Sequence, residues 1–248
     1  SCVEDKKIPS NSAAYHSIAN ADCTLIDLPS ADELHITGLI HFNINVRDYN
    51  RSREFYRAAG FTDQIGPFPE TNTIEVSNGV GIDKLYRMHA ELIHLGTLPD
   101  EPMDLTVPTG RLIDLIDWKD PERLEPPYSV INHLGITYFS LKTDEIDDHL
   151  NHLINAGATM VAGPVSEASG DRAVMVRDPD GTFVKLRQQS DSSPSETVNK
   201  IDYLNINVRN IECSQTFYEM LGLEVQTNFQ SSDGRALSEA MGLGLETK

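Results

Sequence analysis

Alternating apolar and polar residues mark the first regular segment of the chain. From Gly38 onward, every second residue up to position 46 is apolar, and the residues between them are His41, Asn43 and Asn45. The apolar members are Ile40, Phe42, Ile44 and Val46. A period of two residues predicts a strand with one buried face.

A helix is predicted directly after this strand. The turn-rich residues 47–50 contain two candidate N-caps, Asp48 and Asn50. Beyond them, Phe55 and Tyr56 lie on one apolar stripe, where they are expected to anchor the helix in the core. Gly60 follows the stripe and is suited to end the helix.

The same strand and helix return near the C-terminus. Residues 201–223 (IDYLNINVRNIECSQTFYEMLGL) align without a gap with residues 39–61 (LIHFNINVRDYNRSREFYRAAGF). Both copies contain Asn-Ile-Asn-Val-Arg, then Phe-Tyr, then Gly, whereas His41 of the first copy is replaced by Tyr203 in the second. An internal repeat of this kind points to a fold built from similar units.

Shorter apolar stretches complete two units that each read strand, helix and three strands. In the first unit the later strands are expected at 73–76, 85–95 and 111–118. In the second, we expect a strand at 135–141, a helix at 147–156, and strands at 159–163, 173–177 and 182–187. The last two strands are joined by Asp-Pro-Asp-Gly, a strong turn signal. The following GTFVKL matches GRLIDL in the first unit.

These elements predict six segments along the chain. They are an N-terminal arm (1–35), a first module (36–120), a linker (121–130), a second module (131–189), a second linker (190–199) and the start of a third, incomplete module (200–248). Both linkers are rich in proline and charged or polar residues, as is typical of such connections.

Composition excludes some partners but assigns none. The 248 residues carry a net charge of −18, which argues against nucleic acid as a partner because phosphate binding needs a basic face. No apolar run is long enough to span a membrane. The three cysteines have no metal-binding spacing, and Cys2 and Cys23 would pair only in an exported protein. The location therefore stays open between the cytoplasm and export.

The chain resembles the vicinal oxygen chelate superfamily, which includes glyoxalases, bleomycin-resistance proteins and extradiol dioxygenases. The resemblance rests on HFNINVRD in the first strand, SREFYRAAGF on the helix and DPDGTFVKL before the last strand. It covers residues 38–188 as two modules and continues from Lys200. It implies an α+β fold in which paired βαβββ modules form a curved mixed sheet around a cavity, with helices outside. The chain looks like a four-module member cut short, or one completed by another chain.

The resemblance also implies where a metal would bind. In the family, a first strand supplies His or Gln and a last strand supplies Glu. Here these positions hold His41 and Asp114, a candidate pair for one divalent ion (Fe, Mn, Zn or Ni), unless this half binds no metal. The second module has Tyr138 and Lys185 there, and the third has Tyr203. Cavity or ligand contacts are therefore expected at Tyr138, Lys185, Tyr203 and Tyr86.

One further group of ionisable residues lies in the strand predicted at 85–95. His89 and Glu91 would share one face of this strand, and His94 would lie on the other. We expect them to be surface residues, because their spacing is not that of a helical metal site. No nucleophile–base pair is visible, so no catalytic residue is assigned.

Three functions are compatible with this pattern. The first is a divalent-metal-dependent enzyme acting on a small oxygen-rich or aromatic substrate, as a lyase, dioxygenase or isomerase. The second is a non-catalytic protein that sequesters a small molecule in the same cavity. The third is a structural half of a longer four-module enzyme. A homodimer formed through module pairing is a further expectation.

Overall fold

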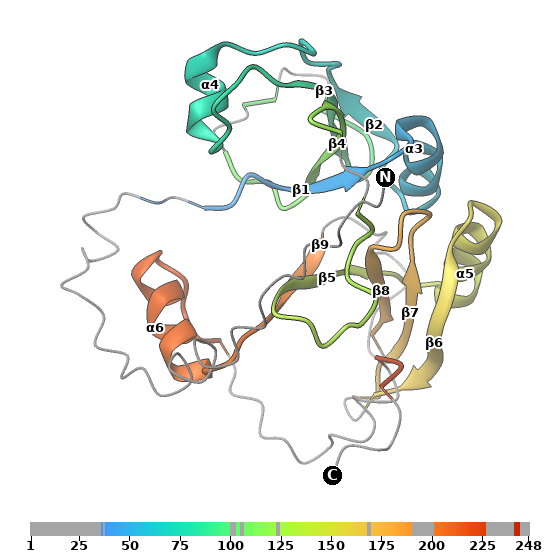
Figure 1. The fold of residues 1–248 in the computed structure, drawn as a ribbon. Helices are drawn as coiled ribbons and strands as arrows, with labels where there is room; N and C mark the ends of the chain where they lie inside the picture. The colour runs from blue at the N-terminus through green and yellow to red at the C-terminus, as the bar shows by residue number, and fades with distance from the viewer. Residues whose placement is uncertain are drawn as a thin grey trace, which may run out of the picture. The chain divides into compact units, whose positions relative to one another are not determined.

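The computed structural model describes residues 36, 38–99, 103–104, 107–122, 125–167, 170–189, 201–226 and 241–243. The chain divides into two compact units. Figure 1 labels the helices and strands of the described residues. One comprises Ser1–Thr37 with Val208–Asn228 and includes helix α6 (Ile211–Met220). The other comprises Gly38–Asn207 with Phe229–Lys248 and contains every described strand. The proposed pairing of Cys2 with Cys23 lies outside the described residues, and Cys213 on α6 is disulfide-bonded.

The larger unit begins with a four-stranded mixed sheet. Its elements are β1 (His41–Val46), α3 (Tyr49–Ala58), β2 (Asp63–Ile65), α4 (Ile74–Gly79), β3 (Arg87–His94) and β4 (Leu112–Asp120). The strand order is β1-β4-β3-β2, with β1 parallel to β4 and the other pairs antiparallel. β1 therefore stands at one edge of this sheet.

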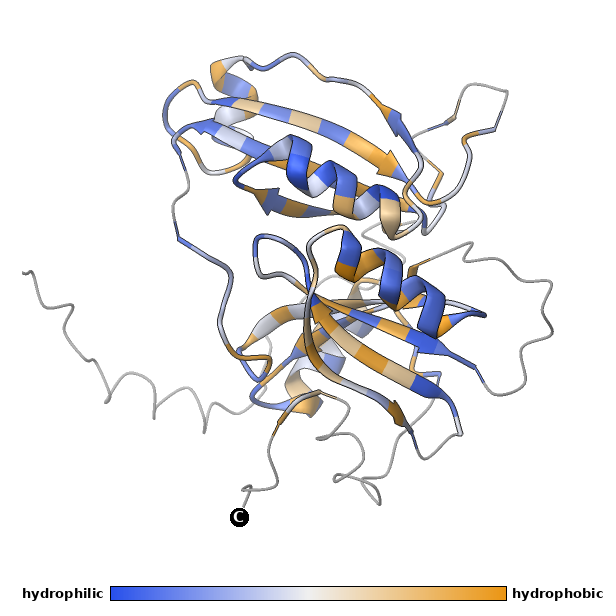
Figure 2. Cartoon of the chain, turned by 90° about the vertical axis from the view of Figure 1, so that its right-hand side faces the viewer, coloured by the Kyte–Doolittle hydropathy of each residue, from blue (hydrophilic) through white to orange (hydrophobic). Residues whose placement is uncertain are grey.

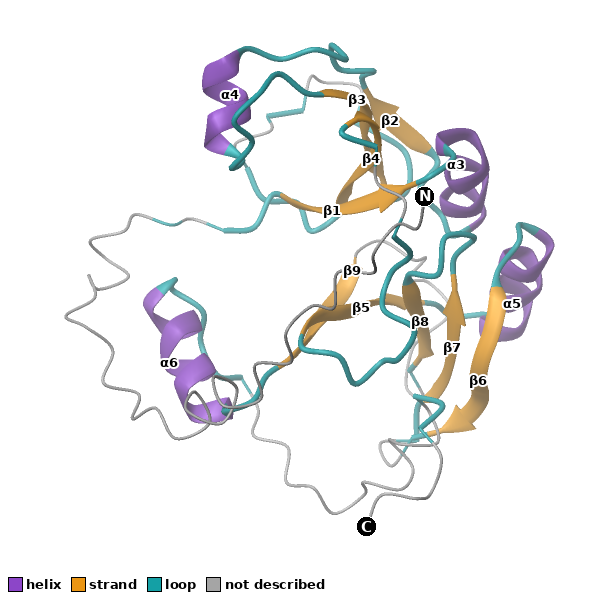
Figure 3. Ribbon diagram, in the orientation of Figure 1, coloured by secondary structure: helices purple, strands orange, loops and turns teal. Residues whose placement is uncertain are grey.

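A five-stranded mixed sheet follows in the same unit. Its elements are β5 (Gly135–Lys142), α5 (Ile146–Asn155), β6 (Thr159–Ser166), β7 (Arg172–Arg177), β8 (Phe183–Gln188) and β9 (Ile201–Asn207). The order is β6-β7-β8-β5-β9, with β5 parallel to β8 and antiparallel to β9. The predicted α+β class is confirmed, and its strands form two mixed sheets (Figure 3).

One strand prediction was wrong. Residues 73–76 were expected to form a strand, but they begin the short helix α4. Thr73 is its N-cap and accepts a hydrogen bond from the backbone N–H of Val76, which satisfies a donor that the first helical turn leaves open. The strand before β3 is instead β2, whose three residues are too few to show an alternating pattern.

Helix α3 starts and ends as the sequence indicates. The side chain of Asp48 accepts a hydrogen bond from the backbone N–H of Arg51 and caps the helix. At the other end, Gly60 has φ +102°, a conformation that glycine adopts without steric cost, and the N–H of Phe61 returns to the carbonyl of Tyr56. No helix in the described part of the chain is both long and apolar enough to cross a membrane.

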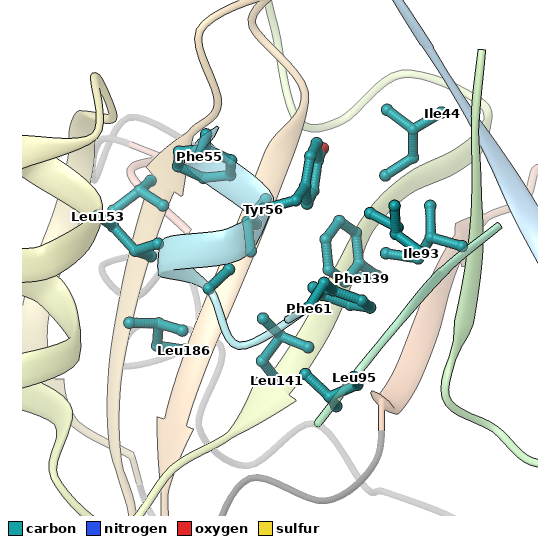
Figure 4. Close-up of a cluster of buried hydrophobic side chains, with 14 of the residues drawn as sticks. Ile44, Phe55, Tyr56, Phe61, Ile93, Leu95, Phe139, Leu141, Leu153 and Leu186 are labelled. Carbon is teal, nitrogen blue, oxygen red and sulfur yellow. The ribbon is translucent and has the colours of Figure 1, made fainter. Parts of the chain in front are cut away.

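The main core of this unit lies between the two sheets and helices α3 and α5. In Figure 4, Phe55 and Tyr56 of α3 lie close to Phe139 of β5 and Leu153 of α5. Apolar and polar bands alternate along the strands in Figure 2, so one face of each sheet supplies this core. Phe55 and Tyr56 are fully buried, as expected for anchor residues.

Polar contacts also join the first module to the turn between β7 and β8. The hydroxyl of Tyr56 donates to Asp178 at 2.8 Å. The hydroxyl of Ser52 and the guanidinium of Arg51 donate to the carboxylate of Asp180 at 2.9 and 2.7 Å. The Asp-Pro-Asp-Gly turn therefore contacts both halves of α3 as well as joining two strands.

Candidate functional site

His41 and Asp114 lie on the same face of the first sheet. Asn43 on β1 pairs with Asp114 on β4, so His41 is a diagonal neighbour of Asp114. Their strand neighbours Ile44 and Ile113 belong to the core, and alternate residues of a strand point to opposite faces. His41 and Asp114 therefore project from the face that turns away from the core.

Both side chains are half-buried and have polar atoms without a partner. Within the described residues, Nδ1 of His41 and Oδ1 of Asp114 are buried and have no hydrogen-bond partner. A buried polar atom left in this state costs about 1 to 3 kcal/mol. Burial raises the pKa of Asp114, and the nearby His41 partly offsets this rise. The pair is thus poorly satisfied by the described protein groups.

The pair fits part of a divalent metal site. Imidazole and carboxylate are common ligands of first-row divalent ions, and unpartnered atoms on such groups are free to bind one. A site needs three or four ligands, however, and the described residues contain no group of three or more His, Cys, Asp or Glu side chains that could hold an ion. One copy of the described chain thus supplies half a site.

The corresponding residues of the second sheet meet each other. Tyr138 lies on β5 and Tyr203 on β9, and their ring centroids are 6.1 Å apart in an edge-to-face arrangement. Nζ of Lys185 on β8 donates to the hydroxyl of Tyr203 at 3.2 Å and forms an ion pair with Glu167. The structure therefore brings together three of the residues selected from the sequence, and adds Glu167.

Two of these side chains, Tyr138 and Lys185, are almost closed off from solvent. Tyr138 is 4% exposed and Lys185 is 3% exposed. They lie beside a small core cluster against which Met241 and Leu243 pack. Burial alone lowers the pKa of Lys185, but its bonds to Glu167 and Tyr203 outweigh burial and raise it, so the ammonium is retained. Its interactions are those of a satisfied internal ion pair.

Tyr86, the remaining residue selected as a cavity contact, lies in the first module. It is 3% exposed, and its ring centroid is 5.2 Å from that of Trp118. Trp118 lies on β4, the strand that also carries Asp114. Its indole N–H donates to Asn45 of β1 at 2.9 Å. Tyr86 therefore supports a residue that contacts β1.

A comparison with known protein families assigns part of the chain to one of them. Residues 85–186 match the model of the Glyoxalase/Bleomycin resistance protein/Dioxygenase superfamily. This part of the chain belongs to that superfamily. The matched range contains Tyr86, Asp114, Tyr138 and Lys185 and begins after His41. The resemblance stated from the sequence is thereby confirmed. No curated protein sequence matches the chain.

Solved structures resemble the chain at low identity. A glyoxalase family protein from Bacillus cereus is 16% identical, with a TM-score of 0.49 over 61% of this chain and 93% of the other. The fosfomycin resistance protein FosX from Listeria monocytogenes, in complex with Mn(II), is 14% identical (TM-score 0.39; 62% and 92%). TnmS3, an antibiotic binding protein from Streptomyces sp. CB03234, is 22% identical (TM-score 0.37; 63% and 98%). Similarity at this level carries no inference about ligands.

A second polar cluster was missed from the sequence. His89 and Glu91 were expected at the surface, but Glu91 is 4% exposed. The hydroxyl of Tyr49 on α3 donates to Oε2 of Glu91 at 2.5 Å. Nε2 of His89 lies 3.3 Å from Oε1, within ion-pair distance but without hydrogen-bond geometry. Strand alternation correctly placed His89 and Glu91 on one face, but it gave no sign that α3 covers that face.

This cluster borders a cavity of about 400 Å³ at the start of α3. The cavity is lined by Arg47, Asp48, Tyr49, Asn50, Glu70, His89, Asp117 and Lys119. Its lining combines three carboxylates with two cationic side chains, and Lys119 pairs with Asp117 at 2.5 Å. The cavity therefore suits a small polar molecule and lies on the side of the first sheet opposite to His41.

The phenol of Tyr49 gives a testable pH dependence. Burial, and next the contact with Glu91, raise its pKa well above the ordinary value near 10. Because the pKa of the phenol is higher in the folded state than in the unfolded state, the neutral phenol stabilises the fold. This stabilisation is fully present below the unfolded-state pKa and is lost as the pH rises toward the folded-state pKa. As the pH rises from about 9 to about 11, the free energy of unfolding in urea should therefore fall less for Tyr49→Phe than for the unsubstituted chain.

The control for this prediction is Tyr128→Phe, because Tyr128 is 61% exposed. That variant should follow the unsubstituted chain over the whole pH range. Identical alkaline profiles for both variants would show that Tyr49 titrates as an ordinary tyrosine.

Proposed function

We propose that the chain is a divalent-metal-dependent enzyme of this superfamily that acts on a small oxygen-rich or aromatic substrate. Its metal ligands are His41 and Asp114. The observation that supports this most is that Nδ1 of His41 and Oδ1 of Asp114, on one sheet face, are buried without a partner in the described structure. Buried polar atoms that serve only the fold are normally hydrogen-bonded, so this pair is better explained as a binding pair.

The surroundings of the pair suit polar recognition. Asn43 and Asn45 lie on the same face of β1 and are exposed, and each amide offers both a donor and an acceptor. Asn45 is held by the indole N–H of Trp118, which fixes its carbonyl oxygen. These amides would orient the oxygens of a substrate beside His41 and Asp114. A divalent ion bound there would act as a Lewis acid toward vicinal oxygens.

Metal titration tests this assignment. Metal-depleted protein should bind Mn²⁺, Zn²⁺ or Ni²⁺ in isothermal titration calorimetry, and His41→Ala or Asp114→Ala should weaken binding by about 100-fold or more, since even an outer-sphere partner contributes about 10- to 100-fold. His152→Ala, which removes an exposed histidine of α5, is the matched control and should bind as the unsubstituted chain does. Unchanged affinity after removal of His41 would refute the assignment.

A non-catalytic binding protein is the second candidate. The cavity of about 400 Å³ beside α3 favours it, because this cavity is polar, needs no metal and lies away from His41. Under this alternative, a bound small molecule would remain after exhaustive chelation. Loss of the molecule together with the metal would favour the enzyme.

A further inference from the structure

The cavity at the start of α3 lies on the face of the first sheet that α3 covers. Asp117 of β4 pairs with His89 of β3, so their side chains lie side by side on this face. Leu115 and Glu91 form the next row on the same face, and Leu115 belongs to the core. The sheet therefore separates this cavity from His41 on the opposite face.

Asp117 presents a nearly buried carboxylate to this cavity. It is 6% exposed and lines the cavity wall. Its Oδ2 accepts a hydrogen bond from the ammonium of Lys119 at 2.5 Å, whereas no donor in the described part of the chain reaches its Oδ1. A carboxylate has about four lone-pair sites, and a buried one is stable only when donors satisfy them. Asp117 can therefore take a further donor from a ligand.

Two more carboxylates of the lining have acceptor capacity to spare. Glu70 has no hydrogen-bond or ion-pair partner for its side chain among the described residues. Asp48 uses Oδ1 to accept the backbone N–H of Arg51, and its other oxygen has no donor there. A ligand in this cavity would therefore meet acceptors on several sides.

Negative charge exceeds positive charge around the cavity. The lining and the adjoining cluster contribute four carboxylates: Asp48, Glu70, Asp117 and Glu91. Arg47 and Lys119 contribute two cations, so the carboxylates remain in excess even when His89 is counted as a third. An anion would be repelled. A metal ion is poorly served, because the described residues hold no group of three or more His, Cys, Asp or Glu side chains that could bind one.

We infer that this cavity is a second ligand site, independent of the metal pair, and that it binds a small organic cation carrying ammonium groups. Lys119 shows that an ammonium fits against the buried carboxylate of Asp117, at 2.5 Å. Tyr49 also lines the cavity, and aromatic rings attract cations. The volume of about 400 Å³ is in the usual range for a small-molecule site.

This inference does not rest on the proposed metal enzyme. It places its ligand on the other face of the first sheet from His41 and Asp114. It also gives the non-catalytic alternative a ligand class and named contacts, which are Asp48, Glu70 and Asp117.

Calorimetric titration of the metal-depleted full chain with 1,4-diaminobutane tests this inference. We expect saturable binding of one diamine per chain. Two matched compounds each lack one required property: 1,4-butanediol has no charge, and tetramethylammonium has no N–H donor. Both should bind at least about 10-fold more weakly, because a hydrogen bond to a charged group is stronger than one between neutral groups.

Substitutions place the diamine in the cavity. Glu70→Gln keeps the size of an exposed side chain, removes its charge and should weaken binding by about 10-fold. Asp117→Asn should act in the same direction, and a urea denaturation curve shows whether that variant folds. Glu125→Gln makes the same change as Glu70→Gln at an exposed carboxylate outside the cavity lining and should bind normally. His41→Ala should also leave diamine binding unchanged.

Each outcome separates this site from the metal pair. Diamine binding that falls with Glu70→Gln and survives His41→Ala supports the inference, whether or not the chain binds a metal. No saturable binding, or equal binding of 1,4-butanediol, would overturn it. Equal weakening by Glu70→Gln and Glu125→Gln would also overturn it, because general attraction to a chain of net charge −18 would then explain the binding. Loss of binding in His41→Ala would place the ligand on the opposite face and overturn it too.

Discussion

Phe55→Ala is expected to lower the free energy of unfolding by about 3 to 5 kcal/mol, the usual cost of removing a fully buried phenylalanine. Phe55 is 0% exposed and lies in the core between the two sheets, with its ring 5.1 Å from that of Tyr56. The substitution removes apolar burial and leaves a cavity that packed neighbours fill only in part. Urea denaturation followed by circular dichroism measures the change.

The internal repeat supplies a matched control for this prediction. Phe217 and Tyr218 of α6 hold the same positions in the second copy, with ring centroids 5.2 Å apart, but Phe217 is 45% exposed. Phe217→Ala should therefore cost less than about 1 kcal/mol, as is usual for surface substitutions. Equal losses in the two variants would contradict the different roles that the structure gives them.

Lys185→Ala is the second substitution for which we expect a large effect. It removes the ammonium partner of Glu167, which keeps only the guanidinium of Arg187 at 4.0 Å, and it removes a donor from Tyr203. Breaking a buried ion pair by removing one partner typically costs about 3 to 5 kcal/mol. We expect a value near the lower end, because the side chain of Glu167 is 18% exposed and recovers some hydration. Guanidinium or urea denaturation curves provide the measurement.

A double substitution tests the cause. Lys185→Met together with Glu167→Leu replaces both charges with apolar groups, which is often neutral or stabilising relative to the intact pair. The double variant should therefore be more stable than Lys185→Ala. If it were equally unstable, the loss would come from packing against Tyr203 and Met175 and not from an uncompensated charge.

The spacing of apolar residues and the residues that start and end helices were enough to predict most of the fold. The alternation from Ile40 to Val46, the N-cap at Asp48 and the glycine at position 60 all have local causes, so the sequence shows them directly. The strand prediction for residues 73–76 was wrong because four residues hold too little pattern to separate a strand from a helical turn. The strand β2 was not predicted, because its three residues hold even less pattern.

The site was harder to predict, because partners distant in sequence determine it. Counting along the repeat selected Tyr138, Lys185 and Tyr203, and the structure places these residues together. Glu167 could not be named, although a lysine in an otherwise apolar strand implies a carboxylate partner somewhere. The burial of Glu91 depends on helix α3 packing over β3, which no local pattern reports.

The contacts of the Asp-Pro-Asp-Gly turn have a consequence for how the two modules depend on each other. Asp178 and Asp180 of the second module satisfy Tyr56, Ser52 and Arg51 of the first, and both modules share one apolar core. A single cleavage in residues 121–130 would therefore cut the chain without separating its halves. We expect each half alone to be less stable than the intact chain, because each would expose apolar core residues and the two halves would lose the bonds that join them. Because the two modules share this core, we expect them to unfold together.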